Sequence, residues 1–271
     1  MMKHAWLIMA HNEFEILQQL VSRLDAPESD IYVHIDRKCP SFPQLDKPQH
    51  ARLFLLQERV DARWGDVSLA NTELLLMETA LANGPYAHYH ILSGVHLPLK
   101  PIEELVQFYD GHQGEEIVHF WPKDEGDADF KLRRFHFPIR DFKSADKLRR
   151  QLCQITWKTV LFVQKKLGIR HLKASQFLKT DQWVSLTEEA VKYLTSHKKE
   201  IVKKYRWSFC CDEYFVASEL SSQPDRFRFF DCPNLLYVKF AYDSPESFPL
   251  SAYPEIQQSG YYWARKFTAQ S

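Results

Sequence analysis

Two adjacent acids, Asp212 and Glu213, close a run of aromatic and apolar residues that begins at Tyr205. Such neighbours remove water from a carboxylate and raise its pKa, and a carboxylate of this kind can act as a general base. A structural interpretation is equally open. Two acids in the first turn of a helix that runs through Phe215 and Leu220 would interact favourably with the helix dipole.

A second candidate for chemistry is the cation pair Arg265 and Lys266, which lies in a C-terminal segment rich in tyrosine, tryptophan and phenylalanine. Guanidinium and ammonium groups can neutralise the charge of a departing diphosphate without a metal ion. The alternative is a pair of solvent-exposed charges near the chain end. Aromatic residues on both sides favour burial, and therefore favour the functional interpretation.

A metal site would most simply use Asp127 and Asp129, which form an acid pair of the D-x-D type that holds a divalent ion against a diphosphate. We expect this pair to lie in a charged loop over residues 123–129, several residues past the nearest predicted strand, which is a poor context for such a site. The histidines include no H-E-x-x-H pattern. The sequence therefore predicts no metal ligands and no cofactor.

The predicted elements begin with a strand–helix–strand unit. Residues 4–10 and 30–36 are apolar runs of strand length, and residues 13–24 carry apolar side chains at helical spacing. Such units build a parallel sheet, and ligands bind beyond the carboxyl ends of its strands, here at His11 and Asp36. No glycine-rich loop follows either strand, so the dinucleotide fingerprint and the phosphate loop are both absent.

Later elements alternate in the same way. The pattern predicts strands over 52–56, 86–92 and 116–121, and helices over 69–80, 102–109 and 188–205. We expect Ser185 and Glu188 to form a capping box at the start of the last of these helices. Trp183 would lie before this helix and Glu213 after it.

Residues 131–179 form the one strongly charged segment, with fourteen basic residues, among them Lys173, and two acids. A solvent-exposed helix face is one explanation. The other is a peripheral contact with anionic lipid, because apolar residues accompany the cations: Leu152, Ile155, Trp157, Val160, Leu161 and Phe162. Nucleic-acid binding is not favoured, since the formal net charge is +0 and no recognition motif occurs.

The composition of the 271 residues, 45% hydrophobic and 26% charged, is that of a globular protein. Five cysteines, an odd number without a two-residue gap, indicate a reducing compartment. No apolar run approaches the roughly 20 residues of a membrane span, and no signal peptide is recognisable. We therefore expect a cytoplasmic protein that contacts a membrane only peripherally.

Seven motifs in collinear order resemble the family of core-2/I-branching β-1,6-N-acetylglucosaminyltransferases and peptide O-xylosyltransferases. Each motif is weak alone, but seven in this order are hard to obtain by chance. They are the first strand with His11-Asn12, Tyr32-Val33-His34-Ile35-Asp36, Trp64-Gly65 with Ser68 and Ala70, Tyr89 to Leu99, Gln182 to Thr187, Asp212 to Phe215, and Ala264-Arg265-Lys266-Phe267.

The resemblance implies an α/β, GT-A-type nucleotide-diphosphosugar transferase fold with a mainly parallel central sheet flanked by helices. It also implies an inverting, metal-independent reaction with Glu213 as the base. The donor contacts that it implies are Ala10, His11, Asp36, Trp64, Arg265 and Lys266. The acceptor contacts that it implies are Glu116, Lys131, Arg134, Gln182 and Trp183.

One position departs from the family pattern. The Ser-Gly-x-Asp-x-Pro motif has His96 in place of its acid, so the contact made by that acid, to the acceptor or within the fold, differs in this chain.

We expect a single catalytic domain over residues 1–271, with a nucleotide-binding half over 1–110 and an acceptor-binding and catalytic half over 111–271. The expected reaction moves N-acetylglucosamine in β-linkage from a UDP-sugar to a saccharide hydroxyl, as in polysaccharide biosynthesis. Two alternatives remain. One is xylosyl transfer from UDP-xylose, and the other is a non-catalytic saccharide-binding module of the same fold.

Overall fold

The computed structural model describes residues 2–172, 177–241 and 244–269. Its centre is a seven-stranded sheet in the order β3-β2-β1-β4-β7-β6-β8. The strands are β1 (His4–Ala10), β2 (Ser29–Ile35), β3 (Arg52–Leu55), β4 (Tyr89–Ser93), β6 (Glu115–Val118), β7 (Ser185–Leu186) and β8 (Arg228–Asp231). The pairs β1–β2, β1–β4, β2–β3 and β6–β8 are parallel, and β7 is antiparallel to β4 and β6.

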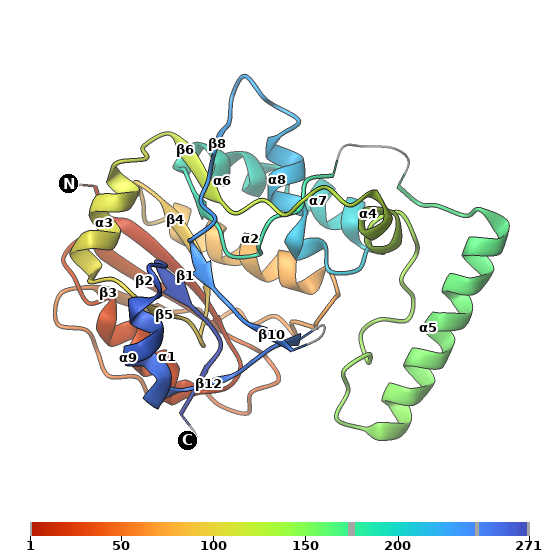
Figure 1. Ribbon diagram of the computed structural model, residues 1–271, viewed down its shortest axis with the longest axis horizontal. Helices are drawn as coiled ribbons and strands as arrows, with labels where there is room; N and C mark the ends of the chain where they lie inside the picture. Colours follow the sequence, from red (N-terminus) through yellow and green to blue (C-terminus); the bar gives the residue numbers. More distant parts are fainter. Residues whose placement is uncertain (1, 173–176, 242–243, 270–271) are drawn as a thin grey trace.

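Helices cover both faces of this sheet (Figure 1). They are α1 (Phe14–Arg23), α2 (Ser68–Leu81), α3 (Ile102–Asp110), α4 (Glu125–Lys131), α5 (Lys147–Leu167), α6 (Glu188–Ser196), α7 (Lys198–Tyr205), α8 (Phe215–Leu220) and α9 (Tyr253–Ile256). The chain moves from β1 to β2 through α1, and in the opposite direction from β3 to β4 through α2. Right-handed crossovers therefore place α1 and α2 on opposite faces.

The predicted strand–helix–strand unit is confirmed. All seven residues of β2 and all but Met9 of β1 are buried, because helices cover both faces of this part of the sheet. Strands buried on both faces show continuous apolar runs instead of alternation. The expected α/β class with a mainly parallel sheet is likewise confirmed.

Short elements complete the C-terminal part of the chain. They are the strands β5 (Leu97–Pro98), β9 (Leu236–Tyr237), β10 (Phe240–Ala241), β11 (Ser244–Pro245), β12 (Phe248–Pro249), β13 (Trp263–Ala264) and β14 (Phe267–Thr268), and the 3-10 turns η1 (Cys211–Glu213), η2 (Leu250–Ala252) and η3 (Gln257–Ser259). β13 pairs with β5 and β9, and β14 pairs with β12. Because β5 closely follows β4, the pairing of β13 with β5 places the C-terminal residues at the carboxyl end of the sheet.

Two local predictions are wrong. The segment expected to be a loop over 123–129 is largely helical, because the Asp124 side chain caps α4 by accepting from the amides of Gly126 and Asp127. Ser185 does not cap a helix, since it lies in β7 and its hydroxyl bonds His90 at 2.8 Å. Thr187 is the N-cap of α6.

The predicted helix over 188–205 is divided at His197 into α6 and α7. Only part of the basic segment is helical, as α5, which stands away from the body of the molecule (Figure 1). Lys173 lies outside the described residues. In the described part of the chain, no helix is long and apolar enough to cross a membrane.

Candidate active site

A cavity of about 750 Å³ opens at the carboxyl ends of β1, β2 and β4. This is the place where open α/β sheets bind their ligands. Eight of the residues singled out from the sequence line it: Ala10, His11, Asp36, Trp64, Gln182, Trp183, Arg265 and Lys266. Chain segments from both ends of the sequence therefore meet in one site.

The Asp36 carboxylate is fixed at the cavity wall by its own loop. It accepts a hydrogen bond from the Lys38 amide at 2.8 Å and from Lys38 Nζ at 2.6 Å. Its backbone amide donates to Ala10 O at 2.9 Å, which joins the ends of β1 and β2. The side chain is thus oriented before any ligand arrives.

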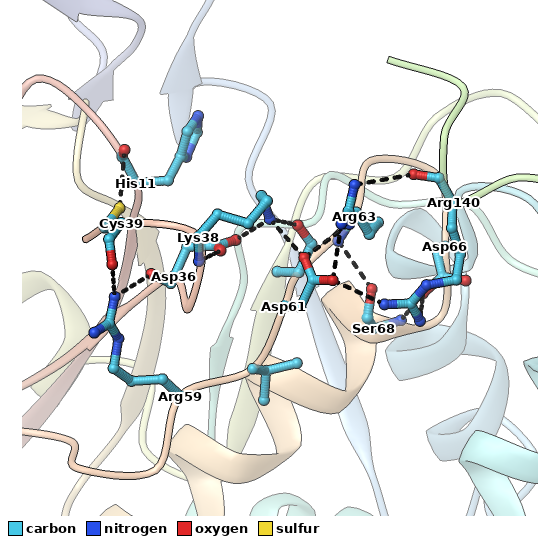
Figure 2. A network of polar contacts seen from close by, with 12 residues as sticks. His11, Asp36, Lys38, Cys39, Arg59, Asp61, Arg63, Asp66, Ser68 and Arg140 are labelled. Carbon is cyan, nitrogen blue, oxygen red and sulfur yellow. Dashed lines mark hydrogen bonds and ion pairs between the residues drawn. The ribbon is translucent and has the colours of Figure 1, made fainter. Parts of the chain in front are cut away.

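Asp61 connects three parts of the cavity rim (Figure 2). Its carboxylate pairs with Lys38 at 3.1 Å, Arg63 at 2.7 Å and Arg140 at 3.1 Å. Burial alone would raise the pKa of Asp61, but hydrogen bonds from Arg63 and Lys38 outweigh it and hold the pKa well below its usual range. Arg140 connects the basic segment to the rim through this network. The spacing of these residues in the sequence does not predict the connection.

The cavity wall is strongly cationic. Its two acids are Glu13 and Asp36, and its six basic residues are Lys38, Arg63, Arg140, Lys143, Arg265 and Lys266. The first three cations pair with Asp61. Among the residues that the structure describes, Lys143, Arg265 and Lys266 have no carboxylate within ion-pairing distance. Of these three, Lys143 was not singled out from the sequence.

The three unpaired cations lie close together. Burial lowers the pKa of Arg265 to about 10, although Asp181 and Asp212 oppose this change. Burial also lowers the pKa of Lys266, and the nearby charges of Arg265 and Lys143 lower it further. Arg265 and Lys266 are half-buried, and Lys143 is exposed. Like charges held close together without partners are unfavourable, and more so where burial removes water. A bound anion would relieve this cost.

The Trp64 loop contacts the segment that leads to Glu213. Lys143 Nζ lies 3.7 Å from the Trp64 ring centroid, and the Cys210 amide donates to Gly65 O at 3.0 Å. Gly65 has φ +77°, and a Cβ there would lie 2.4 Å from the Phe209 ring. Glycine is required for this close approach.

Glu213 does not line the cavity but lies beside its wall. Its backbone carbonyl accepts from the Thr180 amide at 2.9 Å, two residues before the cavity-lining Gln182. Its carboxylate bonds Lys131 Nζ at 2.8 Å and lies 3.6 Å from Lys179 Nζ, and 33% of the side chain is exposed. The expected apolar, desolvating surroundings are therefore replaced by two lysines.

Asp212 has the buried environment that was expected for Glu213. Burial raises the pKa of Asp212 to about 7, and the charge of Glu213 adds to the effect. Glu73, on α2, is also buried, and burial together with Asp212 raises its pKa. Gln182 Nε2 donates to Glu73 Oε1 at 2.8 Å. Glu73 was missed because it stands as an isolated acid within an apolar helix pattern.

Three predicted acceptor contacts do not reach the cavity wall: Glu116, Lys131 and Arg134. Lys131 instead donates to Glu213 at 2.8 Å. Glu116, in β6, is buried and accepts from the Thr187 amide at 2.8 Å and hydroxyl at 2.7 Å. Burial raises its pKa to about 7. Arg134 binds Asp129 at 2.8 Å and the Ile169 carbonyl at 3.0 Å. Glu116 supports the start of α6, and Arg134 joins α4 to the end of α5.

The acid pair of the D-x-D type is engaged by other side chains. Asp127 accepts from Tyr214 at 2.5 Å and from Lys179 at 2.9 Å. Asp129 pairs with Arg134 and with Arg170, each at 2.8 Å. Within the described ranges, no group of three or more histidine, cysteine, aspartate or glutamate residues is placed to hold a metal ion.

His96 has a structural environment. The ring is buried, bonds the Ser93 hydroxyl at 2.7 Å and packs against Trp183 with centroids 4.8 Å apart. Burial lowers the pKa of His96 well below its usual value, and the charge of Arg265 adds to this. A neutral imidazole therefore supports the Trp183 side of the cavity where the family pattern has an acid.

The family model of the Core-2/I-Branching enzymes matches residues 4–226. The chain belongs to this family. It is a glycosyltransferase, with a sugar donor and a saccharide acceptor as its substrates. Its central sheet is mainly parallel and flanked by helices, as the resemblance implied. The match ends before Arg265 and Lys266. The assignment of these two cations to the site therefore depends on the cavity geometry alone.

Other comparisons add little. No curated protein sequence matches the chain. The matching solved structures include the crystal structure of mouse xyloside xylosyltransferase 1 in its apo form. It has 10% sequence identity, a TM-score of 0.42 and 97% coverage of each chain. Likeness at this level supports no inference about activity.

Proposed function

We propose that the protein is an inverting glycosyltransferase that moves N-acetylglucosamine, in β-linkage, from UDP-N-acetylglucosamine to a hydroxyl of a saccharide acceptor. The observation that carries this proposal is the group of Lys143, Arg265 and Lys266. These three cations lack carboxylate partners within the described chain and line one cavity at the carboxyl ends of a parallel sheet. A diphosphate is the group that such a site binds best.

The cavity has room for a complete nucleotide sugar. Its volume of about 750 Å³ falls within the range of small-molecule sites. In our proposal the uracil lies along the backbone of Ala10 and His11, and Asp36 contacts the uridine. The diphosphate lies at the unpaired cations, and the sugar lies under the Trp64 loop.

We assign the general base to Glu213. Its carboxylate takes the proton from the acceptor hydroxyl while that oxygen forms a bond to the anomeric carbon. The bond between that carbon and the diphosphate oxygen breaks, and UDP leaves with the electron pair. One such displacement inverts the anomeric configuration. Lys131, at 2.8 Å, holds the carboxylate in place, and Gln182 and Trp183 provide the wall for the acceptor.

The donor assignment is tested by UDP release with UDP-N-acetylglucosamine and UDP-xylose, each with a panel of saccharide acceptors. We expect the higher rate with UDP-N-acetylglucosamine. A clear preference for UDP-xylose would support the xylosyltransferase alternative instead. Saccharide binding without UDP release from either donor would indicate the non-catalytic module.

The proposed reaction needs no metal ion. The carboxylates of Asp127 and Asp129 are bound by tyrosine, lysine and arginine side chains, and the cavity supplies its own cations. We expect UDP release to be unchanged in EDTA. Complete loss of transfer in EDTA, with recovery on addition of Mn²⁺, would return the two aspartates to the site.

The setting that we propose is the cytoplasm, at the inner face of a membrane on which polysaccharide or glycoconjugate precursors are built. The element that would make this contact is α5.

A further inference from the structure

The helix α5 carries an apolar stripe that is largely exposed in the described structure. Five of its apolar side chains are between 62% and 75% exposed: Leu148, Leu152, Ile155, Phe162 and Leu167. At 100° per residue these positions, with the exposed Val163, fall on one side of the helix. Large apolar side chains gathered in this way mark an interaction surface.

The opposite side of α5 is fixed to the protein. Trp157 is buried and donates from Nε1 to His136 Nδ1 at 2.9 Å. Gln164 is buried and bonds both the amide and the carbonyl of Phe135, each at 2.8 Å. These contacts set the rotation of the helix. Trp157, which the sequence suggested as a membrane contact, therefore faces inward, and the apolar stripe faces outward.

The charge of α5 is entirely positive. Its 21 residues include six basic residues and no acid. From the helical spacing, Lys147, Lys158 and Lys165 lie along one edge of the stripe and Arg149 along the other. Lys166 falls within the stripe, at the helical angle of Leu148, and its Nζ lies 5.8 Å from the Phe162 ring centroid, so its long side chain can extend to the phosphates. An apolar stripe bordered by cations is typical of a helix that lies in the surface of an anionic bilayer.

We propose that this outward face of α5 docks on an anionic phospholipid membrane. The helix would lie in the plane of the headgroups, with its apolar side chains below and its lysines and arginines at the lipid phosphates. A second copy of the chain fits this face poorly. A two-fold contact would oppose the same cations on both copies, and α5 has no acid to pair with them.

Docking through α5 would bring the donor cavity close to the bilayer. Arg140, Lys143, Ser144 and Ala145, in the segment just before the helix, line that cavity. The acceptor would accordingly be a saccharide carried at the membrane. The docking surface itself does not depend on the transferase activity, so the two proposals can fail separately.

The test is co-sedimentation of the full chain with phosphatidylcholine vesicles, with and without phosphatidylglycerol. We expect binding only to the anionic vesicles, and weaker binding at high salt. L152E and F162E should each lower the partition coefficient at least about tenfold, because a charge replaces a buried apolar side chain. K158Q/K165Q should lower it roughly 25-fold, at about fivefold per cation.

Matched controls are available on the same chain. F240E changes an exposed phenylalanine outside α5, and K199Q/K203Q removes two exposed lysines from α7. Both should bind vesicles like wild type. Equal melting temperatures for all variants would separate lost docking from lost folding.

Three results would overturn the proposal. The first is no binding of the wild type to anionic vesicles. The second is undiminished binding by the α5 variants. The third is a wild-type dimer in solution that L152E or F162E converts to a monomer, since that result would assign the stripe to a second copy of the chain.

Discussion

Replacing Glu213 with glutamine is expected to lower turnover by roughly a hundredfold to ten-thousandfold, the usual contribution of a general base. Glutamine keeps the size of the side chain but cannot accept the acceptor proton. Because Glu213 lies beside the cavity wall and does not line it, the affinity for UDP should stay close to that of the wild type. UDP release at saturating acceptor and calorimetric titration with UDP measure the two quantities.

A matched control for this variant is Glu219→Gln. Glu219 also pairs with a lysine, Lys204 at 2.6 Å, but on α8 and away from the cavity. Its replacement should leave turnover unchanged. If Glu213→Gln kept full activity while Asp212→Asn lost it, the base would have to be assigned to the neighbouring residue.

Replacing Arg265 with methionine should weaken UDP binding roughly tenfold to a hundredfold, the effect of losing about 1.5–3 kcal/mol from a charge-assisted hydrogen bond. Lys266→Met should have an effect of the same sign. For Arg265→Met, we expect stability without ligand to rise or stay equal, because the variant no longer buries an unpaired guanidinium. Methionine can still pack on Trp183, whose ring centroid lies 4.6 Å from the guanidinium carbon.

Two measurements check the expected loss of UDP affinity and the expected equal or higher stability of Arg265→Met. Denaturant unfolding without ligand gives the free energy of unfolding, and calorimetry gives the affinity for UDP. Lys239→Met, an exposed lysine outside the cavity, is the control and should change neither quantity. A destabilised Arg265→Met protein with unchanged affinity for UDP would show that the guanidinium has a structural role.

The first half of the fold was predictable because its strands are buried on both faces and therefore form continuous apolar runs. The place of the cavity followed from the same elements, since the ends of β1 and β2 had to lie side by side. His11 and Asp36 were found in this way, without any tertiary information. Arg265 was found from its aromatic neighbours, which indicated burial.

Other features depend on contacts between distant segments. Lys143 reaches the cavity because Arg140 pairs with Asp61, 79 residues earlier in the chain. Glu213 was expected among apolar neighbours, but the fold brings Lys131 and Lys179 to its carboxylate. No local sequence pattern predicts ion pairs between residues so far apart in the chain. Ser185 and Thr187 could both cap a helix by residue type, and only the bond from His90 to Ser185 decides between them.

The central claim is that the cavity binds a UDP-sugar diphosphate through its own cations. The most direct test is a crystal structure of the protein soaked with UDP-N-acetylglucosamine. The account predicts diphosphate oxygens within hydrogen-bond distance of Arg265 and Lys266, close to Lys143, with the uridine at Asp36. A diphosphate bound outside this cavity, or held by a metal ion on Asp127 and Asp129, would contradict it.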